Sequence, residues 1–232
     1  MPIRKVLFSL AAGFVLAASP VLSEDALRTL TVTGEGRASG APDMATVNLG
    51  VQREARQARA AMAAASEAAG AVLATLGDAG IESRDIQTTR VGLDPVYARQ
   101  SDNAPPRITG YVASNDLVVR VRDLSSLGAV LDAVVSDGAN TFRGIRFGIS
   151  DPTVLAAEAR TAAVGDAIAR AETLAAAAGL SLGDIHSLSE GGGGAIPQPM
   201  MRAAVMAESA VPVAQGEVDI TARVTIVYAI DE

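Results

Sequence analysis

The feature that most limits how this chain can fold is a long alanine-rich helical pattern that occurs twice with the same ending. Residues 79–89 read AGIESRDIQTT, and residues 178–188 read AGLSLGDIHSL. In both segments the pattern ends at a glycine, an aliphatic residue follows, and Asp-Ile stands at the same offset. Glycine directly after the last helical turn is typical of a helix C-terminus. We interpret the segments as parts of a duplicated unit; chance convergence of alanine-rich helix ends is the alternative.

Apolar residues that recur every three or four positions predict two long helices. The first pattern covers about 53–76 and the second about 151–178. This spacing places one apolar stripe along each helix. Asp151-Pro152 is typical of a helix start, and Asp123 is expected to cap a shorter helix between the two long ones.

Alternation of apolar and polar residues predicts the strands. It occurs over 29–36, 45–51, 111–121 and 218–228, and further strands are expected near 86–97, 142–149 and 185–188. The predicted fold class is α+β. It consists of duplicated strand–helix–strand–strand units, whose mixed or antiparallel sheets are covered by the two long helices. Two related subdomains would have a boundary near residues 122–140.

The N-terminus has the composition of a secretory signal peptide. Arg4 and Lys5 precede the uncharged stretch 6–18, which is shorter than the roughly 20 residues of a spanning helix. Pro20 interrupts the apolar run, and Ser23 is a suitable last residue before cleavage. Residues 1–23 are therefore predicted to be the signal peptide. Residues 24–232 would then be a periplasmic chain without a transmembrane segment, whereas the alternative is an uncleaved membrane anchor.

Cysteine content and charge exclude several classes of protein. The chain has no cysteine, so it carries neither a lipid-modified cysteine nor a disulfide. Without Arg4 and Lys5, the 19 basic residues become 17 arginines against 26 acidic residues, a net charge of −9. Nucleic acid and anionic lipid both require clustered positive charge. We therefore expect no nucleic-acid partner.

Few residues suggest catalysis, and we assign no catalytic, cofactor-binding or metal-binding residue. His186 is the sole histidine. It aligns with Gln87 across the repeat, which favours an exposed strand position over a catalytic base. The chain lacks the ligand spacings typical of zinc and calcium sites. The glycines at 191–194 lack the lysine and Ser or Thr of a phosphate-binding loop. No cofactor is expected.

The glycine- and proline-rich segment 191–215 is predicted to contain no regular element, and it carries Met200, Met201 and Met206. Their thioethers could be oxidised to sulfoxides or bind a soft metal. They could equally cover an apolar surface or contact a partner, and the sequence leaves these roles open.

Several stretches resemble the SIMPL-domain family, also called DUF541. They cover 30–51, 80–97, 110–140 and 218–230, and the most specific are the glycine-bounded first strand and Gly-Tyr-x-Ala-Ser-Asn at 110–115. This family includes periplasmic oxidative-stress defence proteins and immunogenic envelope antigens. The resemblance implies a periplasmic, cofactor-free protein of a family with ring- or channel-like homo-oligomers, and it supplies no agreed catalytic residues.

These observations predict a non-enzymatic exported envelope protein that supports oxidative-stress tolerance and forms a homo-oligomer. The alternative is a ligand-binding module, or a hydrolase with an unrecognised carboxylate site. Paired carboxylates cannot be assigned from sequence, because the distance between them defines such a site.

Export is tested by the N-terminus of the protein isolated from the native envelope. Mass spectrometry should show Glu24, or a residue within a few positions of it, as the first residue. Intact Met1 on that material would contradict cleavage.

Overall fold

A computed structural model describes residues 28–98, 106–191, 198–200 and 213–231. The predicted signal peptide, its cleavage site, Met201 and Met206 lie outside the described residues. In chain order the elements are β1 Thr29–Gly40, β2 Met44–Ala55, α1 Ala58–Asp78, the 3₁₀ turn η1 Ser83–Asp85, β3 Ile86–Tyr97, β4 Ile108–Val121, α2 Leu127–Ser136, β5 Thr141–Gly148, α3 Thr153–Ala178, β6 Ser181–Glu190, β7 Gln198–Met200 and β8 Glu217–Asp231.

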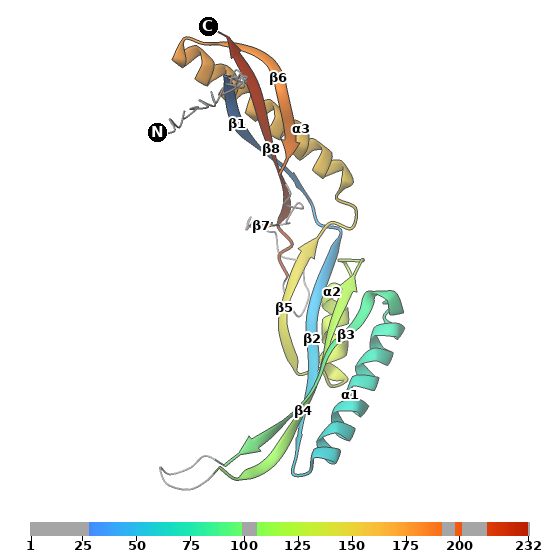
Figure 1. The fold of residues 1–232 in the computed structure, drawn as a ribbon. Coiled ribbons are helices and arrows are strands. Elements are labelled where there is room, and N and C mark those ends of the chain that lie inside the picture. The colour runs from blue at the N-terminus through green and yellow to red at the C-terminus, as the bar shows by residue number, and fades with distance from the viewer. Residues whose placement is uncertain (1–27, 99–105, 192–197, 201–212, 232) are drawn as a thin grey trace, which may run out of the picture.

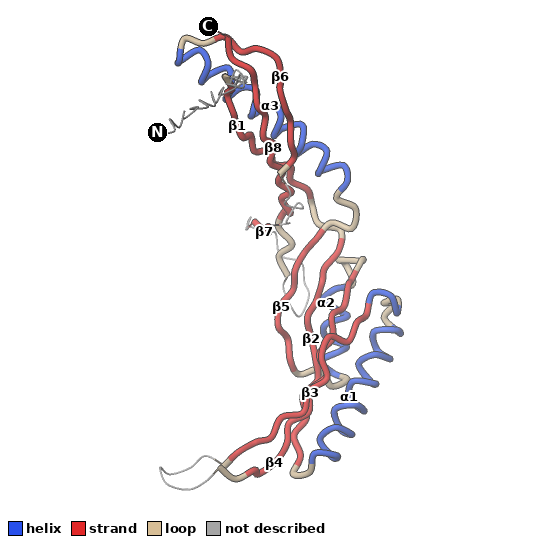
Figure 2. The backbone as a smooth tube through the Cα atoms, viewed as in Figure 1, coloured by secondary structure: helices blue, strands red, loops and turns tan. Residues whose placement is uncertain are grey.

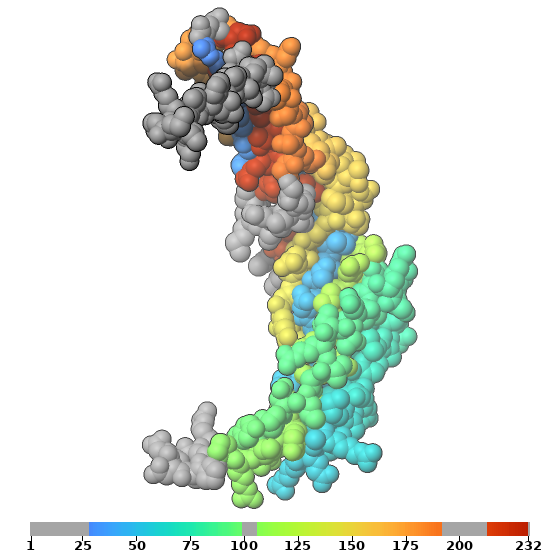
Figure 3. Space-filling model, viewed as in Figure 1, coloured from blue at the N-terminus to red at the C-terminus, as the bar shows by residue number. Residues whose placement is uncertain are grey.

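The strands form two antiparallel sheets, one in each half of an elongated molecule (Figures 1 and 3). Sheet A has the order β1-β8-β6, with β7 also pairing with β8, and sheet B has the order β3-β4-β2-β5. Helix α3 packs on sheet A, and α1 and α2 pack on one face of sheet B. This arrangement confirms the predicted α+β class with antiparallel sheets covered by two long helices.

The chain enters sheet A with β1, crosses to sheet B over residues 41–43, and returns over 149–152. Residues 122–140, where the sequence places a subdomain boundary, contain the whole of α2, the second helix that packs on sheet B. Four α2 residues belong to the core of sheet B, namely Leu127, Val130, Leu131 and Val134. The crossings between the sheets therefore lie outside 122–140, and the division into subdomains stays a prediction.

Both sheets contain the same three-strand arrangement with one long helix. In sheet B it is β2-β4-β3 with α1, and in sheet A it is β1-β8-β6 with α3. Strand β5 directly precedes α3 in the chain, but it pairs with β2 in sheet B. The predicted order, with a strand directly before each long helix, therefore holds for the first unit, where β2 precedes α1. In the second unit the strand equivalent to β2 is β1, and not β5, which directly precedes α3.

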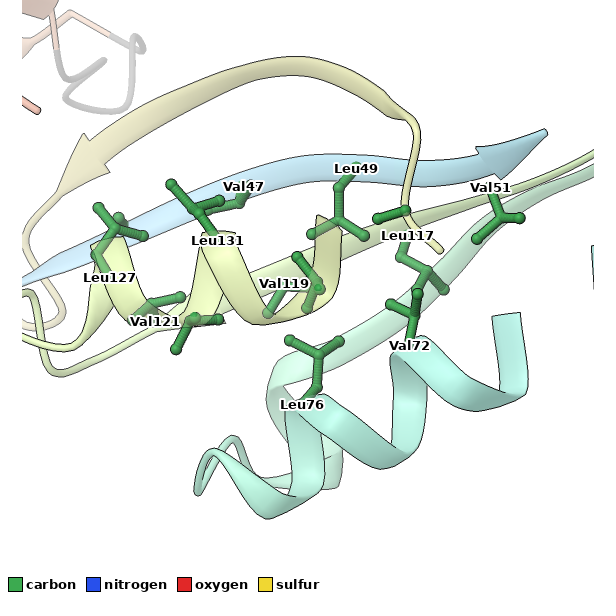
Figure 4. Packing of buried hydrophobic residues seen from close by; sticks show 14 of the residues in the cluster. Val47, Leu49, Val51, Val72, Leu76, Leu117, Val119, Val121, Leu127 and Leu131 are labelled. Carbon is green, nitrogen blue, oxygen red and sulfur yellow. The ribbon is translucent and has the colours of Figure 1, made fainter. Parts of the chain in front are cut away.

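The core of sheet B is built from one side of its two central strands. Alternate residues of β2 and β4 point towards α1 and α2 (Figure 4), and they include Val47, Leu49, Leu117 and Val119. Helix α1 begins at Ala58 rather than near residue 53, because β2 continues to Ala55 and stays paired with β4. Long-range pairing therefore outweighs the local helical pattern at this end.

Helix α3 packs on sheet A, and all of its buried residues are alanines. They recur every fourth residue and are Ala159, Ala163, Ala167, Ala171 and Ala175. Opposite them, β1 carries Gly34 and Gly36. A Cβ atom at Gly34 would overlap the backbone of Ala163 and Ala167, and one at Gly36 would overlap that of Ala159. The two backbones therefore come together at a distance that only glycine allows.

The ends of the shorter elements refine the sequence-based expectations. Asp151 accepts hydrogen bonds from the backbone N–H and the hydroxyl of Thr153, at 3.0 and 2.6 Å, where α3 begins. Asp123 accepts equivalent bonds from Ser125, so it caps the turn before α2 and not the helix itself. The expectation of no regular element in 191–215 is wrong at β7, which pairs with β8.

Replacing Gly34 with alanine should separate α3 from sheet A. Because the added Cβ meets helix backbone that cannot rotate away, the free energy of unfolding should fall by about 3 kcal/mol or more, the upper range for overpacking. Gly165→Ala, on the same helix with open space around its Cβ position, should instead raise it by about 0.5–1 kcal/mol. Urea denaturation measures both, and equal stabilities would contradict the close contact.

Candidate interaction surface

His186 lies on β6 and is exposed. Gln87, its counterpart in the repeat, is exposed on β3. This confirms the interpretation of His186 as an exposed strand residue. Within the described residues, no group of three His, Asp or Glu side chains is placed to hold a metal ion.

Asp85 is a buried acid that the sequence analysis did not single out for a role. It ends η1, and its two carboxylate oxygens accept hydrogen bonds of 2.7 and 2.8 Å from Nε and Nη2 of Arg122, just beyond β4. These bonds hold the pKa of Asp85 below its ordinary value, against the opposing effect of burial. The pair ties the turn after α1 to the end of β4. Its repeat counterpart, Asp184, is exposed.

Asp116 is buried on the face of sheet B that the helices leave uncovered. Arg143 approaches its two oxygens at 3.1 and 3.0 Å. The carboxylate lies above Gly50, where an added Cβ would come within 2.7 Å of Oδ1 and 2.8 Å of the Thr141 hydroxyl. Glycine at position 50 therefore makes the space in which this carboxylate is buried.

Asp219, on β8, is the third buried carboxylate of the described residues. It accepts a 2.6 Å hydrogen bond from the Ser39 hydroxyl and has Arg37 at 3.5 Å. Each of the three carboxylates is thus matched to an arginine. A hydrolytic pair needs two carboxylates that flank one bond, and these three acids instead connect neighbouring elements.

Large apolar side chains are exposed on one terminal strand of each sheet, β3 in sheet B and β6 in sheet A. On β3, Val91 and Leu93 are 58% and 41% exposed, and on β6, Ile185 and Leu188 are 51% and 54% exposed. A helix about 10 Å wide covers roughly two strands spaced about 4.8 Å apart. The third strand of each unit is therefore left beside its helix with little cover.

The outer edges of β3 and β6 have no strand partner in the described part of the chain. An unpaired edge presents free backbone N–H and C=O groups, which favour pairing with another strand. Exposed apolar residues beside such an edge are typical of an interaction surface. We call the two edges with these four residues the edge-strand surface; the sequence could not locate it, because alternation does not reveal which strand ends a sheet.

By length and composition, α1 is the single described helix that could cross a membrane. Its buried row, however, packs on sheet B and consists of Ala61, Ala65, Ala69, Val72 and Leu76. In this structure the helix serves as the cover of a protein core.

Comparison with known proteins gives one family and several relatives. The family described as "SIMPL: Protein of unknown function (DUF541)" matches residues 30–228. The 26 kDa periplasmic immunogenic protein of Brucella melitensis is 40% identical over 210 residues, which are 87% of this chain and 84% of the relative. Proteins named "Uncharacterized protein YggE" are more distant. The one from Edwardsiella ictaluri is 29% identical over 78% of this chain and 75% of its own length. The one from Escherichia coli K12 is 26% identical over 81% and 75%.

Replacing Asp85 with asparagine should lower the free energy of unfolding at pH 7 by about 1.5–3 kcal/mol, the usual contribution of hydrogen bonds to a charged group. A carboxyl group with a lowered folded-state pKa stabilises the fold above its unfolded pKa of about 3.9, and this stabilisation is lost as the pH falls through the folded value. The difference from the parent protein should therefore shrink in acid.

The measurement is chemical denaturation at several pH values between 7 and 2.5. Asp184→Asn is the matched control, since Asp184 occupies the equivalent repeat position but is exposed, and it should change stability by less than about 0.5 kcal/mol. A difference for Asp85→Asn that stays constant down to the lowest pH would contradict the assignment.

Proposed function

Because the chain belongs to the SIMPL (DUF541) family, we propose that it is a non-enzymatic periplasmic protein of the bacterial envelope that assembles with copies of itself. The names of the Brucella relatives place those proteins in the periplasm. The predicted signal peptide at residues 1–23 supports the same location for this chain.

The edge-strand surface is the observation that carries the proposal of self-association. Four large aliphatic residues stand exposed on two unpaired strand edges. Burying apolar surface stabilises a contact by about 25 cal/mol per Å². A second copy can bury the side chains and pair the backbone groups at once, and symmetric association of identical chains is the usual way in which such contacts form.

The arginine-matched carboxylates support a structural rather than a catalytic role. General acid–base catalysis needs a group whose proton affinity suits the reaction and which can reach a substrate. Asp85, Asp116 and Asp219 are buried and face Arg122, Arg143 and Arg37, respectively. A hydrolase or ligand-binding module remains the alternative that a screen against generic substrates would test.

A role in oxidative-stress tolerance is the part of the proposal that rests on the family resemblance alone. A strain that lacks the gene should survive a peroxide challenge less well than its parent, and the gene supplied in trans should restore survival. Equal survival of the two strains would remove this role while leaving self-association unaffected.

Light scattering on the tag-free mature protein tests self-association. At micromolar concentration the mass should exceed that of one chain and should fall on dilution if the contact is reversible. A mass equal to one chain throughout a tenfold dilution series would contradict the proposal.

A further inference from the structure

We propose that two copies of this chain pair through the outer edges of β3, antiparallel and about a two-fold axis that passes between the two Gly92 residues. This inference rests on the proposed self-association and names the surface that carries it. The observation behind it is that residues 90–94 are complementary to themselves when read in opposite directions.

The segment reads Arg-Val-Gly-Leu-Asp. In an antiparallel pair centred on Gly92, each residue faces the one that is equally distant on the other side of the centre. Gly92 then faces the partner's Gly92, Val91 faces the partner's Leu93, and Arg90 faces the partner's Asp94. Opposite charges meet at both ends, and aliphatic residues meet between them.

The pleat of β3 separates these contacts onto two faces. Val91 and Leu93 are opposite Asn115 and Ala113 of β4, and Ala113 is buried against α1, so both aliphatic residues lie on the helix-covered side of sheet B. Arg90 and Asp94 alternate with them and lie on the open face. Pairing would therefore extend the apolar layer on one side and place two ion pairs on the other.

Within one chain, Arg90 and Asp94 form only a long, exposed ion pair with each other. Their side chains are 58% and 69% exposed, and Arg90 Nη2 is 3.9 Å from Asp94 Oδ2 across Gly92. An exposed ion pair of this length contributes little to the stability of one chain. In the paired form each residue would instead stand directly opposite a charge of the other sign, an arrangement that stabilises antiparallel strands.

The ends of the segment limit the pairing to these five residues. The register of β3 against β4 shifts between Thr88 and Arg90, and such irregularities bend a strand away from its line. On the other side, Pro95 has no N–H to donate to a ladder. A short paired segment bounded in this way favours a closed two-fold contact over continued stacking of strands.

The other strand of the edge-strand surface, β6, does not have this property. An antiparallel pair that matches Ile185 with the partner's Leu188 would leave Asp184 and Glu190 without a cation from the opposite β6, because that strand carries acidic residues but no arginine or lysine. In addition, Glu190 accepts a 2.7 Å hydrogen bond from Arg160 of its own α3. Charge complementarity therefore selects β3 over β6.

Disulfide formation tests the register, because the chain contains no cysteine of its own. Residues directly opposite in an antiparallel pair have Cα atoms about 4.5–5.5 Å apart, within the range of about 4.4–6.8 Å that a disulfide spans. Gly92→Cys should therefore form a covalent dimer under mild oxidation at micromolar concentration. Its Cβ would approach the Ser114 hydroxyl, which a rotation of that side chain relieves.

Thr88→Cys is the matched control on the same exposed strand. In the proposed register this residue lies about 27 Å along the strand from its own copy, at about 3.4 Å per residue. It should remain monomeric on a non-reducing gel. Only a two-fold contact centred on Gly92 joins cysteines at position 92 and leaves those at position 88 apart.

A charge exchange tests the surface without cysteines. Asp94→Arg places like charges opposite each other at both ends, and it should raise the dissociation constant by about tenfold or more. The double variant R90D/D94R restores opposite charges and should return the constant to within about threefold of the parent value. Unfolding of the three proteins at concentrations below dissociation should be the same, since the exchanged residues are exposed.

The outcomes separate this inference from the proposal beneath it. A single-chain mass for the parent protein at all concentrations would overturn both. The parent protein could instead assemble while Gly92→Cys shows no preferential crosslinking and Asp94→Arg has no effect on assembly. That result would overturn the β3 contact and leave the proposal of self-association unaffected. Crosslinking at position 92 together with rescue by R90D/D94R would establish it.

Discussion

The close contact between α3 and β1 is the constraint on which the sheet A half of the molecule depends. Gly34 and Gly36 have no side chain to hold the helix away, and alanines at every fourth position of α3 meet them. Each alanine buries little area, so this contact depends on close approach rather than on large side chains. The larger buried groups come from β8, where Ile226 and Tyr228 complete the same core. A chain with no tryptophan and few aromatic residues can form a core in this way.

The small side chains of the helices also explain why apolar residues on the outer strands β3 and β6 are exposed. In α1 the first turns pack Ala61 and Ala65 against Ala113, and the later turns supply Val72 and Leu76 (Figure 4). One narrow helix per three-strand unit covers two of the strands and leaves the third uncovered. In Figure 2, the long helices α1 and α3 (blue) each run along one side of a sheet (red). The exposed aliphatic residues of β3 and β6 therefore follow from the architecture itself, and assembly would complete their burial.

Arginine is the partner of each buried carboxylate in the described part of the chain. The single lysine lies in the predicted signal peptide, so arginine is the sole strong cation from residue 24 onward. Its planar group can bind both oxygens of a carboxylate, as Arg122 does with Asp85. The two copies of the Asp-Ile ending have diverged in this respect, because Asp85 is buried and paired whereas Asp184 is exposed. The repeat thus preserves the course of the chain rather than a pair of equivalent sites.

The order of the amino acids was enough to predict the properties that depend on neighbouring residues. Alternation predicted the strands, four-residue spacing predicted the long helices, and glycine marked their ends, because side-chain direction and backbone freedom act locally. The three-dimensional fold was needed to show that β1 pairs with β8 and that β5 pairs with β2. It also showed that the chain crosses between the sheets at 41–43 and 149–152, and that β3 ends a sheet. Antiparallel pairing joins residues far apart in the chain, and the same alternating pattern suits a central or an outer strand. The choice depends on which surfaces meet in three dimensions. Gly34 and Gly36 are an example, because they contact a helix that lies about 130 residues further along the chain.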